Sequence, residues 1–141
     1  MKIALASDHG GFYLKEEIIS HLKDKYEIIN LGTNDAKSCD YPIYAKKAVK
    51  EILEKRCDRA ILICGTGLGM QMTANRFKGI RAACVSDKYS AKMSRLHNNS
   101  NVLTLGARVV GFGLALEIVD IWLNTEFLAD RHLKRIQMIE E

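Results

Sequence analysis

The part of this sequence best suited to chemistry is a cysteine followed by a loop with glycine at every second position. The stretch AILICGTGLGMQ covers residues 60–71, so an apolar run ends at Cys64 and is followed by Gly65, Gly67 and Gly69. Glycines allow backbone N–H groups to gather around an anion or a developing oxyanion, and a helix starting near Gly69 would point its positive end at the same place. A thiol facing such donors has its thiolate favoured, as a general base or nucleophile requires. The stretch therefore predicts a site for negative charge, with Cys64 as its reactive group.

These features also have structural explanations. Glycine-rich turns between a strand and a helix serve tight packing as well, and a free cysteine is often simply buried. The loop matches neither the G-x-x-x-x-G-K-[ST] phosphate loop nor the complete dinucleotide fingerprint, which disfavours ATP and NAD. None of the four cysteines, Cys39, Cys57, Cys64 and Cys84, belongs to a C-x-x-C pair. A zinc knuckle or a dithiol redox site is therefore not indicated.

Three further polar pairs could carry chemistry: Asp8 with His9, His97 with Asn98, and Arg131 with Arg135. Each pair has a structural alternative. The first could be a helix N-cap followed by a surface imidazole, and the second a helix-ending turn. The two arginines, spaced i and i+4, could form one solvated helix face or a fork that holds a phosphate.

Short apolar runs alternate with helix-sized segments along the chain, and these elements must position the polar residues. The expected strands cover residues 2–7, 26–32, 59–64, 79–86 and 101–106. Their continuous rather than alternating hydrophobicity is typical of strands covered on both faces. With right-handed crossovers the pattern predicts an α/β, Rossmann-like three-layer fold with a five-stranded parallel sheet. Residues 125–141 predict an additional, charged C-terminal helix.

The order of these elements has a consequence for the site. Ligands of such sheets bind beyond the carboxyl ends of the strands, where Asp8 and Cys64 would meet. His97 precedes the fifth expected strand and so falls at the opposite edge. An isologous dimer could bring the His97 end of one chain to the Cys64 end of its partner. We therefore expect a homodimer with shared active sites as the minimal active unit, and two such dimers could pair into a tetramer.

Composition narrows the class of protein. The chain has 141 residues, of which 48% are hydrophobic and 27% charged, so one domain over residues 1–141 is expected. The net charge of +4 comes from basic residues interspersed with acidic ones, which indicates neither nucleic acid nor a membrane surface as a partner. The sequence shows no signal-peptide pattern and no apolar run of about 18 residues, and we expect a cytoplasmic protein.

Taken together, the motifs closely resemble the type B ribose 5-phosphate isomerases and the related galactose 6-phosphate isomerase subunits. The matching stretches run in order across almost the whole chain: SDHGG, DYP, ILICGTGLGM, NRFKGIRAA, SRLHNNSNVLTLGARVVG and RHLKR. The combination of ICGTG with a later HN and a C-terminal RHxxR is specific. The resemblance implies an isomerase, working without metal or organic cofactor, that interconverts ribose 5-phosphate and ribulose 5-phosphate through a cis-enediolate.

The resemblance also implies a role for each matching residue. Cys64 would be the base that moves a proton between the two carbons, and Thr66 would stabilise the enediolate together with the amides of the glycine loop. Asp8 would manage protons on the sugar hydroxyls, and His97, assisted by Asn98, would open the furanose ring. The residues implied to bind or line the substrate are His9, Tyr41, Gly65, Gly67, Gly69, Asn98, Arg108, Arg131, His132 and Arg135.

Several alternatives stay open at this point. Cys64 and His97 occur in one chain, which favours a homomeric, ribose-type enzyme over the two-subunit galactose 6-phosphate isomerases. Departures at residues 71–73 and in the ADRH stretch leave substrate length open, so allose 6-phosphate or galactose 6-phosphate is the second hypothesis. A non-catalytic phosphosugar-binding module would need neither Cys64 nor His97. A flavodoxin-like electron carrier would usually have a Ser/Thr-rich loop where this chain has residues 8–10.

Overall fold

Five parallel strands form one sheet at the centre of the molecule. The computed structural model describes residues 1–141, and its strands are β1 (Lys2–Ser7), β2 (Glu27–Asn30), β3 (Arg59–Cys64), β4 (Ala82–Cys84) and β5 (Val102–Gly106). Their order across the sheet is β2-β1-β3-β5-β4, and every pairing is parallel. The α/β, Rossmann-like fold expected from the sequence is confirmed. The two edge strands, β2 and β4, are shorter than the segments predicted for them.

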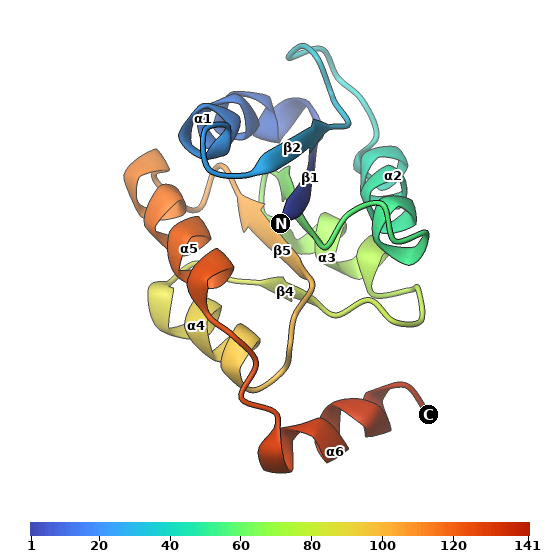
Figure 1. The fold of residues 1–141 in the computed structure, drawn as a ribbon. Helices are drawn as coiled ribbons and strands as arrows, with labels where there is room; N and C mark the ends of the chain where they lie inside the picture. Colours follow the sequence, from blue (N-terminus) through green and yellow to red (C-terminus); the bar gives the residue numbers. More distant parts are fainter.

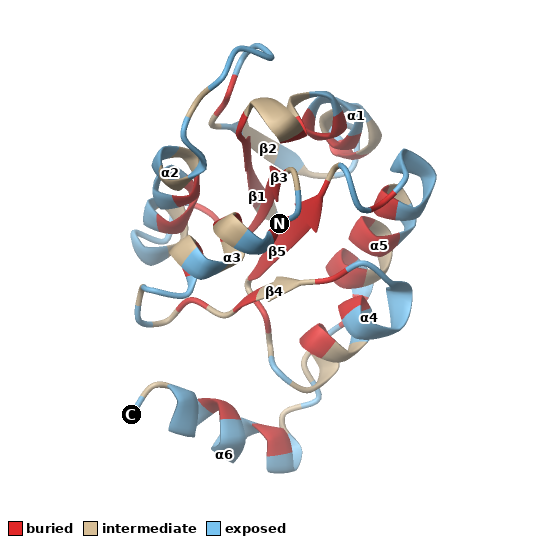
Figure 2. Ribbon diagram, turned by 180° about the vertical axis from the view of Figure 1, so that it is seen from behind, coloured by how far each residue is buried: buried red, intermediate tan, exposed pale blue.

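Helices cover both faces of the sheet, because each central strand is apolar on both sides. The helices α1 (Phe12–Leu22), α4 (Lys88–Leu96) and α5 (Phe112–Asn124) lie on one face, and α2 (Tyr41–Leu53) and α3 (Leu68–Ala74) on the other (Figure 1). A short 3-10 helix, His9–Gly11, precedes α1. Two apolar layers result, one around Trp122 and one around Met70. The central strands β1, β3 and β5 and the facing sides of the helices are the buried part of the molecule (Figure 2).

The last helix, α6 (Asp130–Ile139), lies apart from the sheet (Figure 1). The additional C-terminal helix is therefore present, but it begins later than the predicted segment, because residues 125–129 form a linker after α5. Hydrogen bonds on either side of α6 tie it to the rest of the chain. The Leu128 N–H donates to the Leu96 carbonyl at 3.1 Å, and the Glu140 carboxylate accepts from the Gly79 N–H at 3.1 Å.

The outer edge of β4 is covered by a side chain instead of a strand. The Asn75 amide accepts from the Ala82 N–H at 2.8 Å and donates to the Ala82 carbonyl at 3.0 Å. Gln71 donates to the same carbonyl at 3.3 Å. The Asn75 amide thus supplies the donor and the acceptor that a further strand would have supplied.

No helix of the structure has the length and apolar character that crossing a membrane would require.

Candidate active site

Cys64 is the last residue of β3, and its sulfur is held by the loop that follows. The side chain is buried, with 4% of its surface exposed. The Gly67 N–H donates to Cys64 Sγ at 3.1 Å, and the Leu68 N–H donates to Thr66 Oγ1 at 3.3 Å. An amide N–H directed at sulfur stabilises negative charge on it. Thr66 itself is exposed beside the thiol, where a ligand can reach it.

The loop can follow this path only because residue 67, within it, and residue 106, against which it packs, are both glycines. Gly67 has φ +81°, and a Cβ atom there would lie 2.9 Å from Cys84 Sγ. A Cβ on Gly106, at the end of β5, would lie 2.6 Å from the Thr66 carbonyl oxygen. The glycines therefore let the backbone after Cys64 settle directly on β5, and Cys84 Sγ lies 3.7 Å from the same Thr66 carbonyl.

Asp8 and His9 follow β1 and lie against the same loop. A Cβ on Gly10 would be 3.3 Å from both Asp8 Oδ1 and the Gly65 nitrogen, so the two segments touch. The Asp8 carboxylate accepts from the Gly11 N–H at 3.2 Å and caps the 3-10 helix, as the structural alternative predicted. Capping occupies Oδ1.

The ring of His9 is oriented by a distant loop. The Cys39 N–H donates to His9 Nδ1 at 3.2 Å. A backbone N–H can only donate, so Nδ1 is the accepting nitrogen and the hydrogen of a neutral ring sits on Nε2. His9 therefore carries a donor on its free nitrogen, which suits an anionic ligand.

Tyr41 and Arg108 complete this group of residues. A Cβ on Gly69 would lie 2.6 Å from the Tyr41 ring, and one on Gly65 would lie 3.3 Å from Arg108 Nη1. The Arg108 N–H also donates to the Gly65 carbonyl at 3.0 Å. We call Asp8, His9, Tyr41, residues 64–69 and Arg108 the cysteine face; all lie in segments beyond the carboxyl ends of strands or, for Tyr41, packed against them.

A second group of residues lies at the opposite end of the strands, where β5 begins. His97 ends α4 five residues before β5, and its ring stacks on His132 of α6, with centroids 4.2 Å apart and planes 15° apart. Arg131 and Arg135 project from the exposed side of α6. We call these four residues, together with the exposed Asn98, the histidine face.

His132 is the buried member of the histidine face. It is 5% exposed, and its Nε2 has no hydrogen-bond partner. Burial lowers the pKa of His132, and the neighbouring His97, Arg131 and Arg135 lower it further by charge repulsion. A neutral imidazole is thereby favoured in the stack near neutral pH.

A single chain does not unite the two faces. The cysteine face lies where β1, β3 and β5 end, and His97 lies where β5 begins. Arg108, which the resemblance implies to bind the substrate as Arg131 and Arg135 do, lies on the cysteine face. Each chain therefore presents two separate candidate half-sites, each with its own charged and titratable groups.

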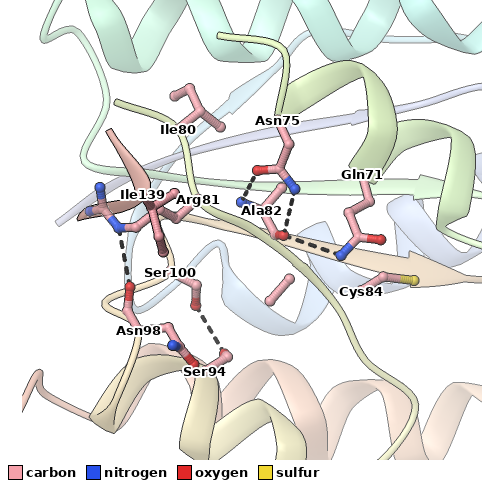
Figure 3. Close-up of a pocket in the computed structure, with 11 residues that line it drawn as sticks. Gln71, Asn75, Ile80, Arg81, Ala82, Cys84, Ser94, Asn98, Ser100 and Ile139 are labelled. Carbon is pink, nitrogen blue, oxygen red and sulfur yellow. Dashed lines mark hydrogen bonds between the residues drawn. The ribbon is translucent and has the colours of Figure 1, made fainter. Parts of the chain in front are cut away.

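A cavity of about 410 Å³ runs along β4 between the two faces. Its lining includes Gln71 and Asn75 of α3, Cys84 of β4, Asn98 and Ser100 after α4, and Ile139 of α6. Figure 3 shows the Arg81 guanidinium beside the Asn98 carbonyl, to which its Nε donates at 3.1 Å. Cys64 and the arginines of α6 do not line this cavity, so it is not the site of the predicted chemistry.

Two contacts of the candidate half-sites were not predicted from the sequence. Cys39 orients His9 from 30 positions away in a polar loop, and the Cys84 thiol lies on the Thr66 carbonyl. Nothing in the type or spacing of either cysteine indicates these contacts.

Comparison with known proteins places the chain in a family. The sequence pattern of the family described as Ribose/Galactose Isomerase matches residues 3–139. The chain belongs to this family. Ribose-5-phosphate isomerase B of Escherichia coli (strain K12) is 47% identical over 139 residues, covering 98% of this chain and 93% of that protein. The putative sugar phosphate isomerase YwlF of Bacillus subtilis (strain 168) is 48% identical over 144 residues, covering 100% of this chain and 96% of that protein.

Solved structures of ribose/galactose isomerases match the fold closely. Ribose-5-phosphate isomerase B of Clostridium thermocellum superposes with a TM-score of 0.98 at 50% identity, covering 99% of this chain and 95% of that one. The enzyme of Mycoplasma genitalium, solved with bound ribulose-5-phosphate, gives 0.95 at 40% identity and covers 98% and 93%. The resemblance to the type B enzymes, first drawn from motifs, is thereby confirmed.

Proposed function

We propose that this chain is an aldose-ketose isomerase that interconverts ribose 5-phosphate and ribulose 5-phosphate, and that residues 1–141 form one sugar-phosphate isomerase domain. The observation that carries the proposal is the buried Cys64 thiol with the Gly67 N–H directed at it. The type B relatives, similar over nearly the full chain, support the choice of substrate.

Cys64 is the base of the proposed reaction. The thiolate takes the proton from C2 of the open-chain aldose and returns it to C1, while the O2 hydroxyl proton is lost and O1 gains one. A proton next to a carbonyl is weakly acidic, so the enediolate needs donors for its oxygens. Thr66 and the amides of the glycine loop supply them, and each well-placed donor contributes about 3 kcal/mol in comparable oxyanion sites. Asp8, whose second carboxylate oxygen is not engaged in capping, moves protons on the sugar hydroxyls.

The substrate phosphate is bound by positive charge and N–H donors in this proposal. His9 presents its Nε2–H, and Arg108 adds a guanidinium on the cysteine face. Arg131 and Arg135, one helical turn apart on α6, provide a fork for the phosphate oxygens. Anchoring the phosphate away from the reacting carbons turns its binding energy into correct orientation. Tyr41 and His132 line the site.

We further propose that each active site combines the cysteine face of one chain with the histidine face of a second copy. The support is the position of His97, which opens the furanose ring with the help of Asn98, at the sheet edge opposite Cys64. An isologous dimer gives two equivalent complete sites. The same proposal locates the enzyme in the cytoplasm, where a reducing environment suits its four free thiols.

Proton exchange in deuterated water tests the role of Cys64. Wild-type enzyme incubated with ribose 5-phosphate should incorporate deuterium at the exchanging carbon, measured by proton NMR. Cys64→Ala should lower kcat by about 100- to 10,000-fold, because the base is lost. Cys57→Ala is the matched control, because Cys57 is a buried thiol whose pKa burial raises, and it lies outside the site. A Cys64→Ala enzyme that keeps most of its rate would refute this mechanism.

The same assay decides whether the preferred substrate is a pentose phosphate or a hexose phosphate. Ribose 5-phosphate, allose 6-phosphate and galactose 6-phosphate are compared by kcat/KM. The highest value with a hexose phosphate would replace the ribose assignment but keep the reaction type. No turnover of any of the three by folded wild-type protein would refute the isomerase proposal.

A further inference from the structure

Arg95 is a charged residue buried where no carboxylate bonds to it. It lies in the last turn of α4 and is 4% exposed. Its Nη1 donates to Asn99 Oδ1 at 2.8 Å and to the Ser100 carbonyl at 2.6 Å, and its Nε donates to the Thr125 carbonyl at 3.1 Å. All three acceptors are uncharged oxygens, so the guanidinium makes hydrogen bonds without forming an ion pair.

The acceptors belong to the two segments that carry the histidine face. Asn99 and Ser100 form the turn that directly follows His97 and Asn98. Thr125 begins the linker from α5 to α6, the helix that bears Arg131, His132 and Arg135. One rigid, planar group therefore joins the segment of the ring-opening histidine to the segment of the phosphate-binding arginines.

Burying this charge is costly for the molecule. Burial, together with repulsion by Arg59, lowers the pKa of Arg95 to about 10, so Arg95 still carries its charge near neutral pH. Apolar residues generally fill a buried space at lower cost than a charged one. A role confined to filling the space under α4 does not need a guanidinium, whereas joining three carbonyl-type oxygens from two segments does.

We propose that Arg95 is a positioning residue that holds the His97 turn and the start of the linker to α6 in register with each other. The inference rests on the proposed function for its catalytic meaning. Arg95 touches no substrate; it acts through His97, Arg131 and Arg135. When the guanidinium is replaced, the two segments keep the His97–His132 stack but lose their buried connection. Their relative placement should loosen, and both ring opening and phosphate binding should suffer.

Steady-state kinetics with ribose 5-phosphate provide the first test. Arg95→Lys keeps the charge but cannot reach both segments, and Arg95→Met keeps the bulk alone. Both should lower kcat/KM by about 10- to 100-fold, with kcat falling and KM rising, as expected for misplaced groups. Arg59→Lys is the matched control, because Arg59 is 8% exposed and bonds the Trp122 and Leu123 carbonyls but neither segment of the histidine face. Its kcat/KM should stay within about threefold of wild type.

Amide hydrogen exchange, followed by mass spectrometry without substrate, separates this proposal from the proposed function. In Arg95→Lys, exchange should become faster in residues 97–101 and 125–135 and stay unchanged in the sheet. If the wild type has no isomerase activity, the proposed function fails, and this exchange pattern alone decides the role of Arg95. Wild-type kinetics in folded Arg95→Lys, or unchanged exchange in both segments, would overturn the proposal. Loss of folding in both variants, seen by circular dichroism, would also overturn it, because Arg95 would then serve the whole molecule.

Discussion

At the scale of single residues, the surroundings of Cys64 depend on a backbone conformation that residues other than glycine rarely adopt. Gly67 has φ +81°, a value that costs an ordinary residue about 1 to 2 kcal/mol. The N–H of this same residue donates to Cys64 Sγ. The position of the donor and the conformation of the loop therefore depend on one glycine.

Gly67→Ala should damage both the loop and the reaction. The added Cβ would meet Cys84 Sγ at 2.9 Å and the Leu105 carbonyl carbon at 3.0 Å, so the loop has to move away from β5. We expect kcat to fall by about 100-fold, since an error of roughly 1 Å in such a site has this effect. Urea unfolding should show a loss of about 1 to 3 kcal/mol.

The control for this change is Gly111→Ala. Gly111 has φ −66°, and nothing lies within 4 Å of its Cβ position, so activity should match wild type. A Gly67→Ala enzyme as active as Gly111→Ala would show that the loop conformation is not needed for turnover.

The residues at strand ends were the predictable ones. Asp8 and Cys64 directly follow apolar runs, and the carboxyl ends of parallel strands share one edge, so sequence alone indicates that they meet. The Cys39 contact with His9 was not predictable, because it depends on where a polar loop of the chain folds back. The contacts of Arg95 were not predictable either, since its partners are mostly backbone carbonyls, which every sequence has.

At the scale of elements, α4 and α5 are joined under the histidine face by a buried polar chain. Trp122 Nε1 of α5 donates to Ser100 Oγ at 2.8 Å, and Ser100 Oγ lies 2.9 Å from Ser94 Oγ of α4. Ser100 is 1% exposed and Trp122 is fully buried. The turn after His97 is therefore fixed from below by hydrogen bonds that water does not replace.

Ser100→Ala should destabilise the fold by about 1 to 3 kcal/mol in urea unfolding, because it leaves the buried Trp122 N–H without an acceptor. In the Trp122→Phe background, which has no indole N–H, the same change should cost less. Equal costs of Ser100→Ala in the two backgrounds would contradict the assigned hydrogen bond.

Edge strands were the elements whose bounds the sequence predicted least well. Residues 26–32 and 79–86 are apolar over longer stretches than the observed Glu27–Asn30 and Ala82–Cys84. Beyond these bounds the chain still bonds to the neighbouring strand: the Leu31 N–H donates to the Leu5 carbonyl at 2.9 Å, and the Val85 N–H to the Thr104 carbonyl at 3.4 Å. The predicted and observed ends therefore differ in how regular the pairing is, as is common at strand ends. The central strand β3, paired on both sides, matches its predicted bounds.

At the scale of the whole molecule, the cysteine and histidine faces lie at opposite sheet edges, so the proposed enzyme works only as an assembly. The sequence already indicated this separation from the order of elements. The relative placement of two copies depends on surface shape, which a one-dimensional pattern does not encode.

Mixing two inactive variants tests the shared site. Cys64→Ala and His97→Ala chains, refolded together, should recover about a quarter of wild-type activity, because half of the randomly formed dimers contain one intact site of two. Mixing Cys64→Ala with Thr66→Ala is the control and should recover nothing, because both changes lie on the same face. Absence of recovery, with subunit exchange verified by mass spectrometry, would rule out sites shared between chains.

The Asn75 amide on β4 has a consequence for behaviour at high protein concentration. Open sheet borders are where stray strands from other molecules add on and start fibrous aggregates. At Ala82 both main-chain groups are already engaged by a side chain from the same molecule. A strand from another molecule would first have to displace the Asn75 amide from Ala82. Two copies therefore meet through their side chains, and the sheet is not extended by a further strand.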